Sequence, residues 1–249
     1  RDFLDETFII VSGDLVTNFD FKKIKAFHEH KKSKLTITLT SVENPLQFGV
    51  VIANKKGEIE KFLEKPSWGE VFSDTINTGI YVLEPEIMDY IPFGENFDFA
   101  KDLFPKLMRE NITLWGCSMQ GYWRDVGNPE SYREVYKDIY KQEVLLPFKG
   151  TKQVTPTAII YTQEGVEIDP KVRLKGVVVI GKNTKIYEGV TLENVCIGSC
   201  SKIKKHVELI DCVVWNDVSI NTKTKLKNAV ICNNNRIEEE VKASLGVII

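Results

Sequence analysis

A repeat of fixed length in the second half of the sequence constrains the fold more than any other feature. Three apolar segments, which begin at Leu192, Leu209 and Leu226, follow one another at intervals of 17 residues. Upstream, apolar residues recur every six positions, at Ile168, Leu174, Ile180, Ile186 and Leu192. Six-residue units taken three to a turn, each with one inward apolar side chain, are typical of a β-helix. A β-sandwich fits less well, because its turns would not recur at a fixed residue count.

The β-helix is predicted for residues 151–249, and its last turn runs into the end of the chain. Extending the register aligns Val247 with Val230, and the sequence stops at Ile249 within that turn. A solenoid needs a capping element with a polar outer face. We therefore expect the natural protein to continue beyond Ile249 and, because the first residue is Arg1 rather than methionine, to begin before it.

The first half alternates strand and helix patterns. Residues 7–12 form a β-branched run that predicts a strand buried on both faces, and residues 20–32 have helical spacing after a capping Asp20. Alternation at 35–40 completes a β-α-β unit. A hairpin is predicted at 48–63, a strand at 79–83, and helices around 99–108 and 128–142. This order predicts an α/β domain over residues 1–150, in which ligands bind at the carboxyl ends of strands.

Composition excludes several partner classes. Lys and Arg number 33 against 35 Asp and Glu, a net charge of -2, so no footprint for nucleic acid or an anionic membrane is present. No apolar run approaches the length of a membrane span, and the first residues do not resemble a signal peptide. We expect a soluble cytoplasmic protein. The five cysteines lack CxxC spacing, which favours buried free thiols over disulfides or a zinc site: Cys117, Cys196, Cys200, Cys212 and Cys232.

Two aspartates at opposite ends of the first half are candidate metal ligands. Asp14 follows the first apolar run in Ser12-Gly13-Asp14, and Asp125 lies far downstream. If both end strands of one sheet, they can hold one hard cation over a phosphate. Taken singly, Asp14 reads as a turn or capping residue and Asp125 as the partner of Arg124 in a salt bridge.

Five ordered motifs resemble one enzyme family. They are Ser12-Gly13-Asp14, Phe48-Gly49-Val50-Val51, Phe62-Leu63-Glu64-Lys65-Pro66, Ile76-Asn77-Thr78-Gly79-Ile80-Tyr81-Val82-Leu83 and Gly121-Tyr122-Trp123-Arg124-Asp125-Val126-Gly127. Together they resemble the sugar-1-phosphate nucleotidyltransferases, or nucleotide-sugar pyrophosphorylases, that carry a left-handed β-helix. Residues 43–49 and 66–79 look most like the mannose-1-phosphate guanylyltransferase branch. The family's glycine-rich loop, which wraps the nucleotide phosphates, is not in this sequence, so the resemblance implies an N-terminally incomplete, Rossmann-like catalytic domain that holds the sugar-phosphate half.

The resemblance implies attack of a sugar-1-phosphate oxygen on the α-phosphorus of a nucleoside triphosphate, with release of pyrophosphate. Asp14 and Asp125 would bind Mg²⁺, which is hard and octahedral and keeps waters and phosphate oxygens as its other ligands. GTP is the favoured nucleotide and GDP-mannose the favoured product. Such a transfer needs positioning and charge neutralisation more than a protein nucleophile.

Two residues of one motif are expected to bind the sugar phosphate. Lys65 would neutralise the phosphate and is counted with Asp14 and Asp125 as catalytic, and Glu64 would accept hydrogen bonds from sugar hydroxyls. Taken alone, Glu64-Lys65-Pro66 is usually a solvated strand end.

The other motifs contribute further candidate substrate-binding residues. Asn77 and Thr78 would hydrogen-bond the sugar, and Gly79 would let the backbone approach it closely. Gly49 would do the same, although an ordinary hairpin glycine is nearly as good an interpretation. Trp123 is equally consistent with a wall of the sugar pocket and with core.

Two other functions stay open. The same two-domain plan occurs in non-catalytic regulatory or assembly subunits, and left-handed β-helices occur in acyltransferases that use a histidine as base. His206 is the only histidine in the repeat, and Lys223 and Glu240 fill its register position in the next turns, which indicates an outward, solvated site. We also expect self-association into a homo-oligomer through the β-helix.

Overall fold

The computed structural model describes residues 3–64, 67, 73–144 and 148–248. The chain divides into two compact units, Arg1–Asp125 and Val126–Ile249, and each is described by itself. The predicted division at residue 150 stays a prediction. Lys65 and Pro66 lie outside the described residues.

A six-stranded mixed sheet forms the centre of the first unit. Its strands are β1 (Phe8–Val11), β3 (Leu35–Ser41), β4 (Gly49–Ala53), β5 (Ile59–Glu64), β6 (Thr75–Leu83) and β7 (Trp115–Ser118). The order is β5-β4-β6-β3-β7, and β1 also pairs with β6. β3 and β7 are parallel, whereas β6 is antiparallel to β1, β3 and β4. β2 (Leu15–Thr17) and β8 (Trp123–Asp125) form a separate antiparallel ladder.

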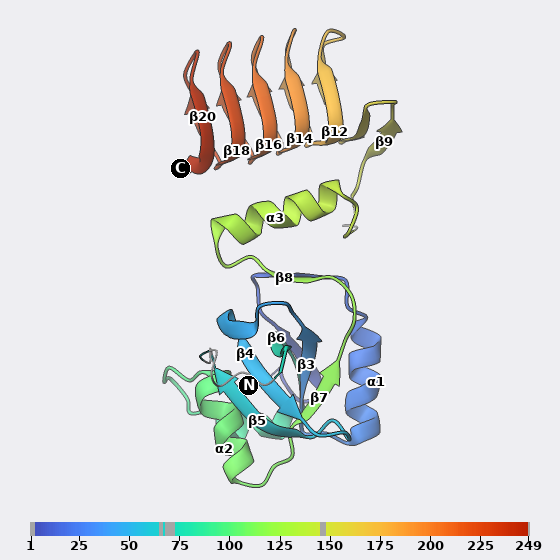
Figure 1. The fold of residues 1–249 in the computed structure, drawn as a ribbon, viewed down its shortest axis with the longest axis vertical. Coiled ribbons are helices and arrows are strands. Elements are labelled where there is room, and N and C mark those ends of the chain that lie inside the picture. The colour runs from blue at the N-terminus through green and yellow to red at the C-terminus, as the bar shows by residue number, and fades with distance from the viewer. Residues whose placement is uncertain (1–2, 65–66, 68–72, 145–147, 249) are drawn as a thin grey trace. The chain divides into compact units, whose positions relative to one another are not determined.

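Helices cover both faces of this sheet because β6 alternates its side chains between two cores. Ile80 and Val82 pack with Ile24 of α1 (Phe21–Lys31), while Tyr81 and Leu83 pack with residues of α2 (Phe104–Arg109). Short helical turns span Pro45–Gln47, Pro85–Tyr90 and Phe99–Leu103. Figure 1 shows α1 beside β7. The predicted α/β class is therefore confirmed for this unit.

One prediction about the first strand is wrong. The run at 7–12 was expected to be buried on both faces, but Ile9 and Val11 of β1 are 37% and 44% exposed. Phe8 and Ile10 pack against the core on one face of β1, whereas Ile9 and Val11 lie on the other face, and within the described residues β1 pairs with β6 alone. A β-branched run reports strand propensity and does not by itself report how many neighbours the strand has.

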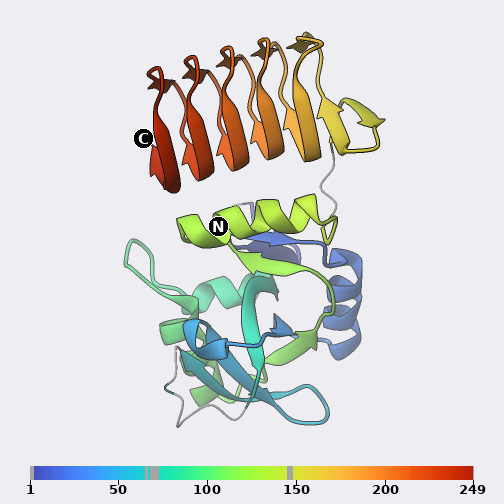
Figure 2. The same cartoon turned by 45° about the horizontal axis from the view of Figure 1, so that its top comes forward.

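The second unit contains α3 (Pro129–Tyr140) and a β-solenoid. One stack comprises β9 (Thr151–Val154), β10 (Ala158–Thr162), β12 (Arg173–Ile180), β14 (Thr191–Ile197), β16 (Glu208–Val214), β18 (Lys225–Ile231) and β20 (Lys242–Ile248). The other comprises β11 (Glu167–Ile168), β13 (Lys185–Ile186), β15 (Lys202–Ile203), β17 (Ser219–Ile220) and β19 (Arg236–Ile237). All pairings are parallel except β9 with β10. Figure 2 shows the successive coils.

The observed register confirms the predicted repeat. Ile203, Ile220 and Ile237 stand in one parallel column, and the first two are completely buried. Between β12 and β14 the spacing falls from 18 residues to 17, through a register shift between Lys175 and Val178.

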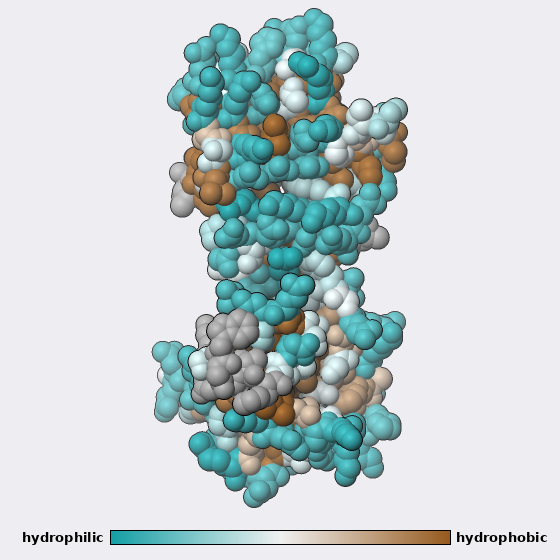
Figure 3. Space-filling model, viewed as in Figure 1, coloured by the Kyte–Doolittle hydropathy of each residue, from teal (hydrophilic) through white to brown (hydrophobic). Residues whose placement is uncertain are grey.

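Left-handed backbone conformations recur at equivalent turn positions of successive solenoid coils. One column of positive φ contains Asn183, Cys200, Asp217 and Asn234, and another contains Asn194, Asp211 and Asn228. Asn and Asp tolerate this region better than other residues with a side chain, which explains their regular spacing. The outward face of these coils is largely hydrophilic in Figure 3.

The cysteines are free thiols, as predicted, but their burial varies. Cys117 and Cys212 are buried, Cys196 and Cys232 are half-buried, and Cys200 is exposed. The exposure of Cys200 corrects the expectation of uniform burial, because that residue occupies a left-handed turn position with φ 59°.

Candidate functional site

The ladder formed by β2 and β8 brings the two candidate metal ligands together. Leu15 lies opposite Asp125, and Asp14 immediately precedes Leu15, so the aspartates are one position from direct cross-strand partners. Asp14 is exposed and Asp125 is half-buried. The meeting place is this two-stranded ladder rather than the main sheet in which the sequence suggested a common edge. Residues 111 positions apart in the chain thus become neighbours.

This donor set fits a cation that is shared with a substrate. Among the described residues, no group of three or more His, Cys, Asp or Glu side chains could hold a metal ion. Magnesium is commonly bound through one or two carboxylates together with waters and phosphate oxygens. Two aspartates are therefore appropriate for Mg²⁺ that arrives with a phosphorylated ligand, and they are too few for a closed protein cage.

The backbone at Gly79 packs against the loop that carries Asp14. The Ser12 amide donates to the Gly79 carbonyl over 3.0 Å. Gly79 has φ +74°, and a Cβ there would lie 3.0 Å from Ser12 Oγ and 3.3 Å from Leu15 Cδ1. A glycine is required because the close approach occurs in the left-handed region. In this structure, the residues that approach Gly79 closely are Ser12 and Leu15, so β6 packs against the loop that carries Asp14.

Asn77 is half-buried and organises its own strand. Its amide nitrogen donates to the Tyr81 hydroxyl over 2.9 Å, and its oxygen accepts from the Gly79 amide over 3.0 Å. An amide side chain has two N–H donors and two acceptor lone pairs, so each end of Asn77 retains capacity for a second partner. Burial raises the pKa of Tyr81, against the opposing effect of the hydrogen bond from Asn77. Tyr81 therefore stays a neutral phenol and supports Asn77.

The Thr78 side chain lies on the opposite face of β6 from the Asn77 side chain. It is 1% exposed, and its hydroxyl donates to the Thr38 carbonyl over 2.8 Å. The Thr78 carbonyl in turn accepts a hydrogen bond from Trp123 Nε1 over 3.0 Å. In this structure Thr78 anchors Trp123 through its backbone, and its hydroxyl is engaged with the sheet.

Trp123 and Glu64 contact residues that are adjacent in the chain, Phe48 and Gly49. The Trp123 ring is half-buried and meets Phe48 edge-on, with centroids 5.2 Å apart. Gly49 is the cross-strand partner of Glu64, and a Cβ on Gly49 would lie 2.9 Å from Glu64 Oε2 and 2.6 Å from Phe62 Cζ. The space beside Gly49 is thus occupied by the carboxylate and the ring.

Sequence reasoning missed two residues that shape this region. Tyr81 holds Asn77, and Phe48 packs on Trp123. Both stand in the motifs quoted above, and the signal for Tyr81 was its position four residues after Asn77 in a strand, which places the two side chains on one face.

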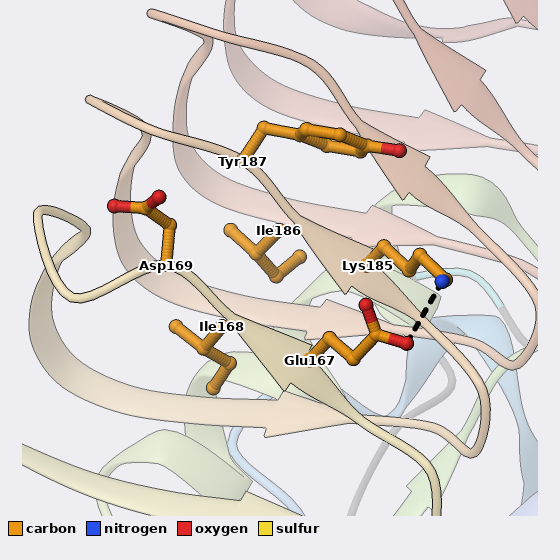
Figure 4. Close-up of a pocket in the computed structure, with 6 residues that line it drawn as sticks. All are labelled: Glu167, Ile168, Asp169, Lys185, Ile186 and Tyr187. Carbon is orange, nitrogen blue, oxygen red and sulfur yellow. Dashed lines mark ion pairs between the residues drawn. The ribbon is translucent and has the colours of Figure 1, made fainter.

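The solenoid offers no comparable set of reactive groups among its described residues. His206 is exposed at φ +58°, in one column with Lys223 and Glu240, as its register predicted. Figure 4 shows a groove formed by Glu167–Asp169 and Lys185–Tyr187. There the Lys185 amine forms an exposed ion pair with the Glu167 carboxylate at 2.8 Å.

No helix within the described ranges is both long enough and apolar enough to cross a membrane.

Comparisons with known proteins assign both halves of the chain. Residues 1–142 match the family model described as Nucleotidyl transferase, and residues 157–249 match the EIF2B subunit epsilon LbH domain. The second match agrees with the predicted left-handed β-helix. A UTP--glucose-1-phosphate uridylyltransferase from Synechocystis is 33% identical over 76% of this chain and 49% of its own length. A mannose-1-phosphate guanyltransferase from Neurospora crassa is 28% identical over 98% of this chain and 68% of its own. The chain thus spans from about half to two thirds of these relatives.

Proposed function

The chain belongs to the nucleotidyl transferase family, and on that premise we propose that it transfers a nucleotidyl group from a nucleoside triphosphate to a sugar-1-phosphate. A phosphate oxygen of the sugar-1-phosphate attacks the α-phosphorus, the bond from the α-phosphorus to the bridging oxygen breaks, and pyrophosphate leaves. The observation that carries the proposal is the β2–β8 ladder, which makes Asp14 and Asp125 neighbours.

Asp14 and Asp125 are proposed to hold Mg²⁺ together with phosphate oxygens. When bound, such an ion neutralises phosphate charge and helps to orient the two reactants. The protein's own contribution is to fix the carboxylates. The hydrogen bond from the Ser12 amide to Gly79 ties the Asp14 loop to β6, and pairing with Leu15 fixes the backbone of Asp125.

The sugar side is proposed to consist of Glu64, Asn77 and Lys65, with Trp123 as a wall. Glu64 presents an acceptor, and Asn77 retains one donor and one acceptor after its contacts with Tyr81 and Gly79. Lys65 follows Glu64 directly and would neutralise the phosphate. We assign the remaining predicted residues, Gly49, Thr78 and Gly79, to positioning these groups, because their contacts lie within the protein.

Mannose-1-phosphate and GTP are the proposed substrates, which would make GDP-mannose the product. The motif resemblance and the names of relatives from several organisms support this choice, whereas the Synechocystis relative is named for glucose-1-phosphate and UTP. Glucose and mannose differ only in the configuration of one hydroxyl group, so few contacts can distinguish the two sugars. Cytoplasmic localisation and self-association through the solenoid remain predictions.

A second candidate is a regulatory or assembly subunit of the same fold. One observation favours it, because the solenoid matches a domain named for a subunit. Such a subunit needs neither metal-dependent turnover nor both aspartates.

Isothermal titration separates the two functions. Mannose-1-phosphate, glucose-1-phosphate and GDP-mannose are titrated with and without Mg²⁺ into the protein and its Asp125→Asn variant. An enzyme should bind the sugar phosphates, with binding of GDP-mannose strengthened by Mg²⁺ in the wild type and unaffected by Mg²⁺ in the variant. Binding without any response to Mg²⁺ or to the substitution would support the subunit instead.

A further inference from the structure

The ladder that makes Asp14 and Asp125 neighbours is short. Its strands are three residues long, and the pairs are Leu15 with Asp125, Val16 with Arg124 and Thr17 with Trp123. An isolated two-stranded ribbon is at best marginally stable in water. The spacing of the two aspartates therefore depends on the contacts that hold the ends of the ladder.

One end of the ladder is continued by the Asn18 side chain. The Asn18 amide donates to the Tyr122 carbonyl over 3.2 Å, and the Tyr122 amide donates to Asn18 Oδ1 over 2.8 Å. In a hydrogen-bonded antiparallel pair, two opposite residues exchange both of these bonds through their backbones. Here the side-chain oxygen takes the place of the backbone carbonyl, so residues 18 and 122 form a fourth pair although β2 ends at Thr17.

Thr17 supports the same contact. Its hydroxyl donates to the Tyr122 carbonyl over 2.8 Å and accepts from the Phe19 amide over 3.2 Å. Phe19 is 5% exposed and belongs to the core cluster that contains Ile24 and Ile80. The backbone of Tyr122 is thus joined, at both its N–H and its carbonyl, to a segment that is fixed in the core.

The backbone at Gly121 leaves room for the Asn18 oxygen. Gly121 has φ +143°, and a Cβ there would lie 2.5 Å from Asn18 Oδ1 and 3.4 Å from Phe19 Cδ1. Glycine adopts this φ readily, whereas residues with a side chain rarely do. The contact that Asn18 makes therefore requires the glycine of the motif that leads to Asp125.

These contacts determine the register of β8. Asp125 follows Tyr122 by three residues, so a fixed pairing of residues 18 and 122 places Asp125 opposite Leu15. A slip of one residue in a ladder turns every side chain to the other face. The Ser12 amide, bonded to the Gly79 carbonyl over 3.0 Å, holds the segment on the other side of Asp14.

We propose that Asn18 is a positioning residue for the two metal-binding carboxylates, an inference that rests on the proposed function. Asn18 Oδ1 fixes the start of β8, and the ladder register extends that constraint to Asp125. Asn18 acts through Tyr122 and is not itself a metal ligand. Loss of its oxygen should weaken the joint hold of Asp14 and Asp125 on Mg²⁺ while both carboxylates remain in place.

Four variants isolate the Asn18 oxygen. Asn18→Ala removes it, Asn18→Asp keeps an acceptor at the same atom, and Gly121→Ala would displace it. Asn216→Ala is the matched control on the solenoid, because Asn216 is likewise exposed and its Oδ1 accepts a hydrogen bond from the Ser199 amide over 2.7 Å. Thermal melting verifies that each variant is folded.

Amide hydrogen exchange tests the structural step without any turnover. Exchange across Trp123–Asp125 is followed by mass spectrometry in the full-length protein. Asn18→Ala and Gly121→Ala should speed this exchange roughly three- to tenfold, the value of one neutral hydrogen bond. Asn18→Asp and Asn216→Ala should exchange at the wild-type rate.

The metal step is measured from the Mg²⁺ dependence of pyrophosphate release. The assay contains about 0.15 M salt, which partly screens the charge that Asn18→Asp adds. The Mg²⁺ concentration at half-maximal rate should rise roughly three- to tenfold in Asn18→Ala and Gly121→Ala, with kcat at saturating Mg²⁺ close to that of the wild type. A purely structural role would reduce the amount of active protein, which lowers kcat and leaves the half-saturating Mg²⁺ concentration unchanged.

Three results would overturn the inference. They are wild-type exchange of β8 in Asn18→Ala, an unchanged half-saturating Mg²⁺ concentration in that variant, and equal effects of Asn18→Ala and Asn18→Asp. A wild-type protein that releases no pyrophosphate is a separate outcome, because it would refute the proposed function and, with it, any metal-positioning role of Asn18.

Discussion

A methyl group added at Gly49 tests the role proposed for the Glu64 carboxylate in sugar binding. The Cβ of Gly49→Ala would lie 2.6 Å from Phe62 Cζ and 2.9 Å from Glu64 Oε2, whereas ordinary contact begins at 3.4 Å. The Phe62 ring cannot yield freely, because it packs edge-on against the buried Phe104 with centroids 5.4 Å apart. Forcing one extra methyl into such packing costs about 1–3 kcal/mol. Chemical denaturation should show this loss of unfolding free energy.

The same substitution should weaken sugar-phosphate binding, because it displaces the Glu64 carboxylate. A hydrogen bond to a charged group contributes about 1.5–3 kcal/mol, which corresponds to roughly ten- to hundredfold in affinity. Calorimetric titration of mannose-1-phosphate measures the change in Gly49→Ala, in Glu64→Ala and in the double variant. We expect the two substitutions to be non-additive, with Gly49→Ala nearly silent once Glu64 is alanine.

Gly246→Ala is the matched control, since no atom lies within 4 Å of the Cβ it would add. It should change neither stability nor binding. If Gly49→Ala weakened binding equally with and without the Glu64 carboxylate, the carboxylate would not be the group through which position 49 acts, and its proposed role would be wrong.

Three further predictions concern the metal site and the solenoid. Asp125→Asn should lower kcat by roughly a hundredfold or more in a pyrophosphate-release assay, because it removes the charge of one of the two proposed metal ligands, while thermal melting stays near that of the wild type. Ile220→Ala, at a completely buried position, should lower the guanidinium unfolding free energy by about 2–5 kcal/mol, and a smaller loss would argue against a packed solenoid interior. Two lysine partners hold the pKa of Glu188 at about 2, against an ordinary 4.5, so the stability it contributes is present above pH 4.5 and is lost as the pH falls towards 2. Glu188→Gln should remove that part of the pH dependence, and 1 M salt should weaken it in the wild type.

The solenoid could be predicted from sequence because its contacts repeat at a fixed separation. Ile203, Ile220 and Ile237 meet their equivalents one coil away, so periodicity alone specifies register. The N-terminal caps of two helices could also be predicted from the sequence. The Asp20 side chain accepts a hydrogen bond from the Lys22 amide, and the Asn128 side chain accepts from the amides of Glu130 and Ser131. These donors lie in the first turns of α1 and α3, as the positions of Asp20 and Asn128 before helical patterns indicated.

The first unit was less predictable because its contacts join distant segments. A β-branched run at 7–12 could not reveal that one face of β1 is exposed and that, among the described residues, β1 pairs with β6 alone. Similarly, the motif around Asn77 and Thr78 did not reveal which side chain faces the core, because a bulge between Ile37 and Leu39 alters the pairing of β3 with β6 at that point.

The candidate site could likewise be predicted only in part. The motifs identified the residue types, but only the fold brings Asp14 beside Asp125, through two strands of three residues each. Pairing of such short strands leaves little signal in either segment.

Pyrophosphate release coupled to sugar-1-phosphate consumption tests the central claim most directly. The full-length protein is incubated with GTP, Mg²⁺ and mannose-1-phosphate, and pyrophosphate and nucleotide sugar are quantified together. The account predicts equimolar formation of both products, dependent on Mg²⁺ and lost in both Asp14→Asn and Asp125→Asn. Turnover that survives both substitutions, or no turnover with mannose-1-phosphate or glucose-1-phosphate and their matching triphosphates, would contradict it.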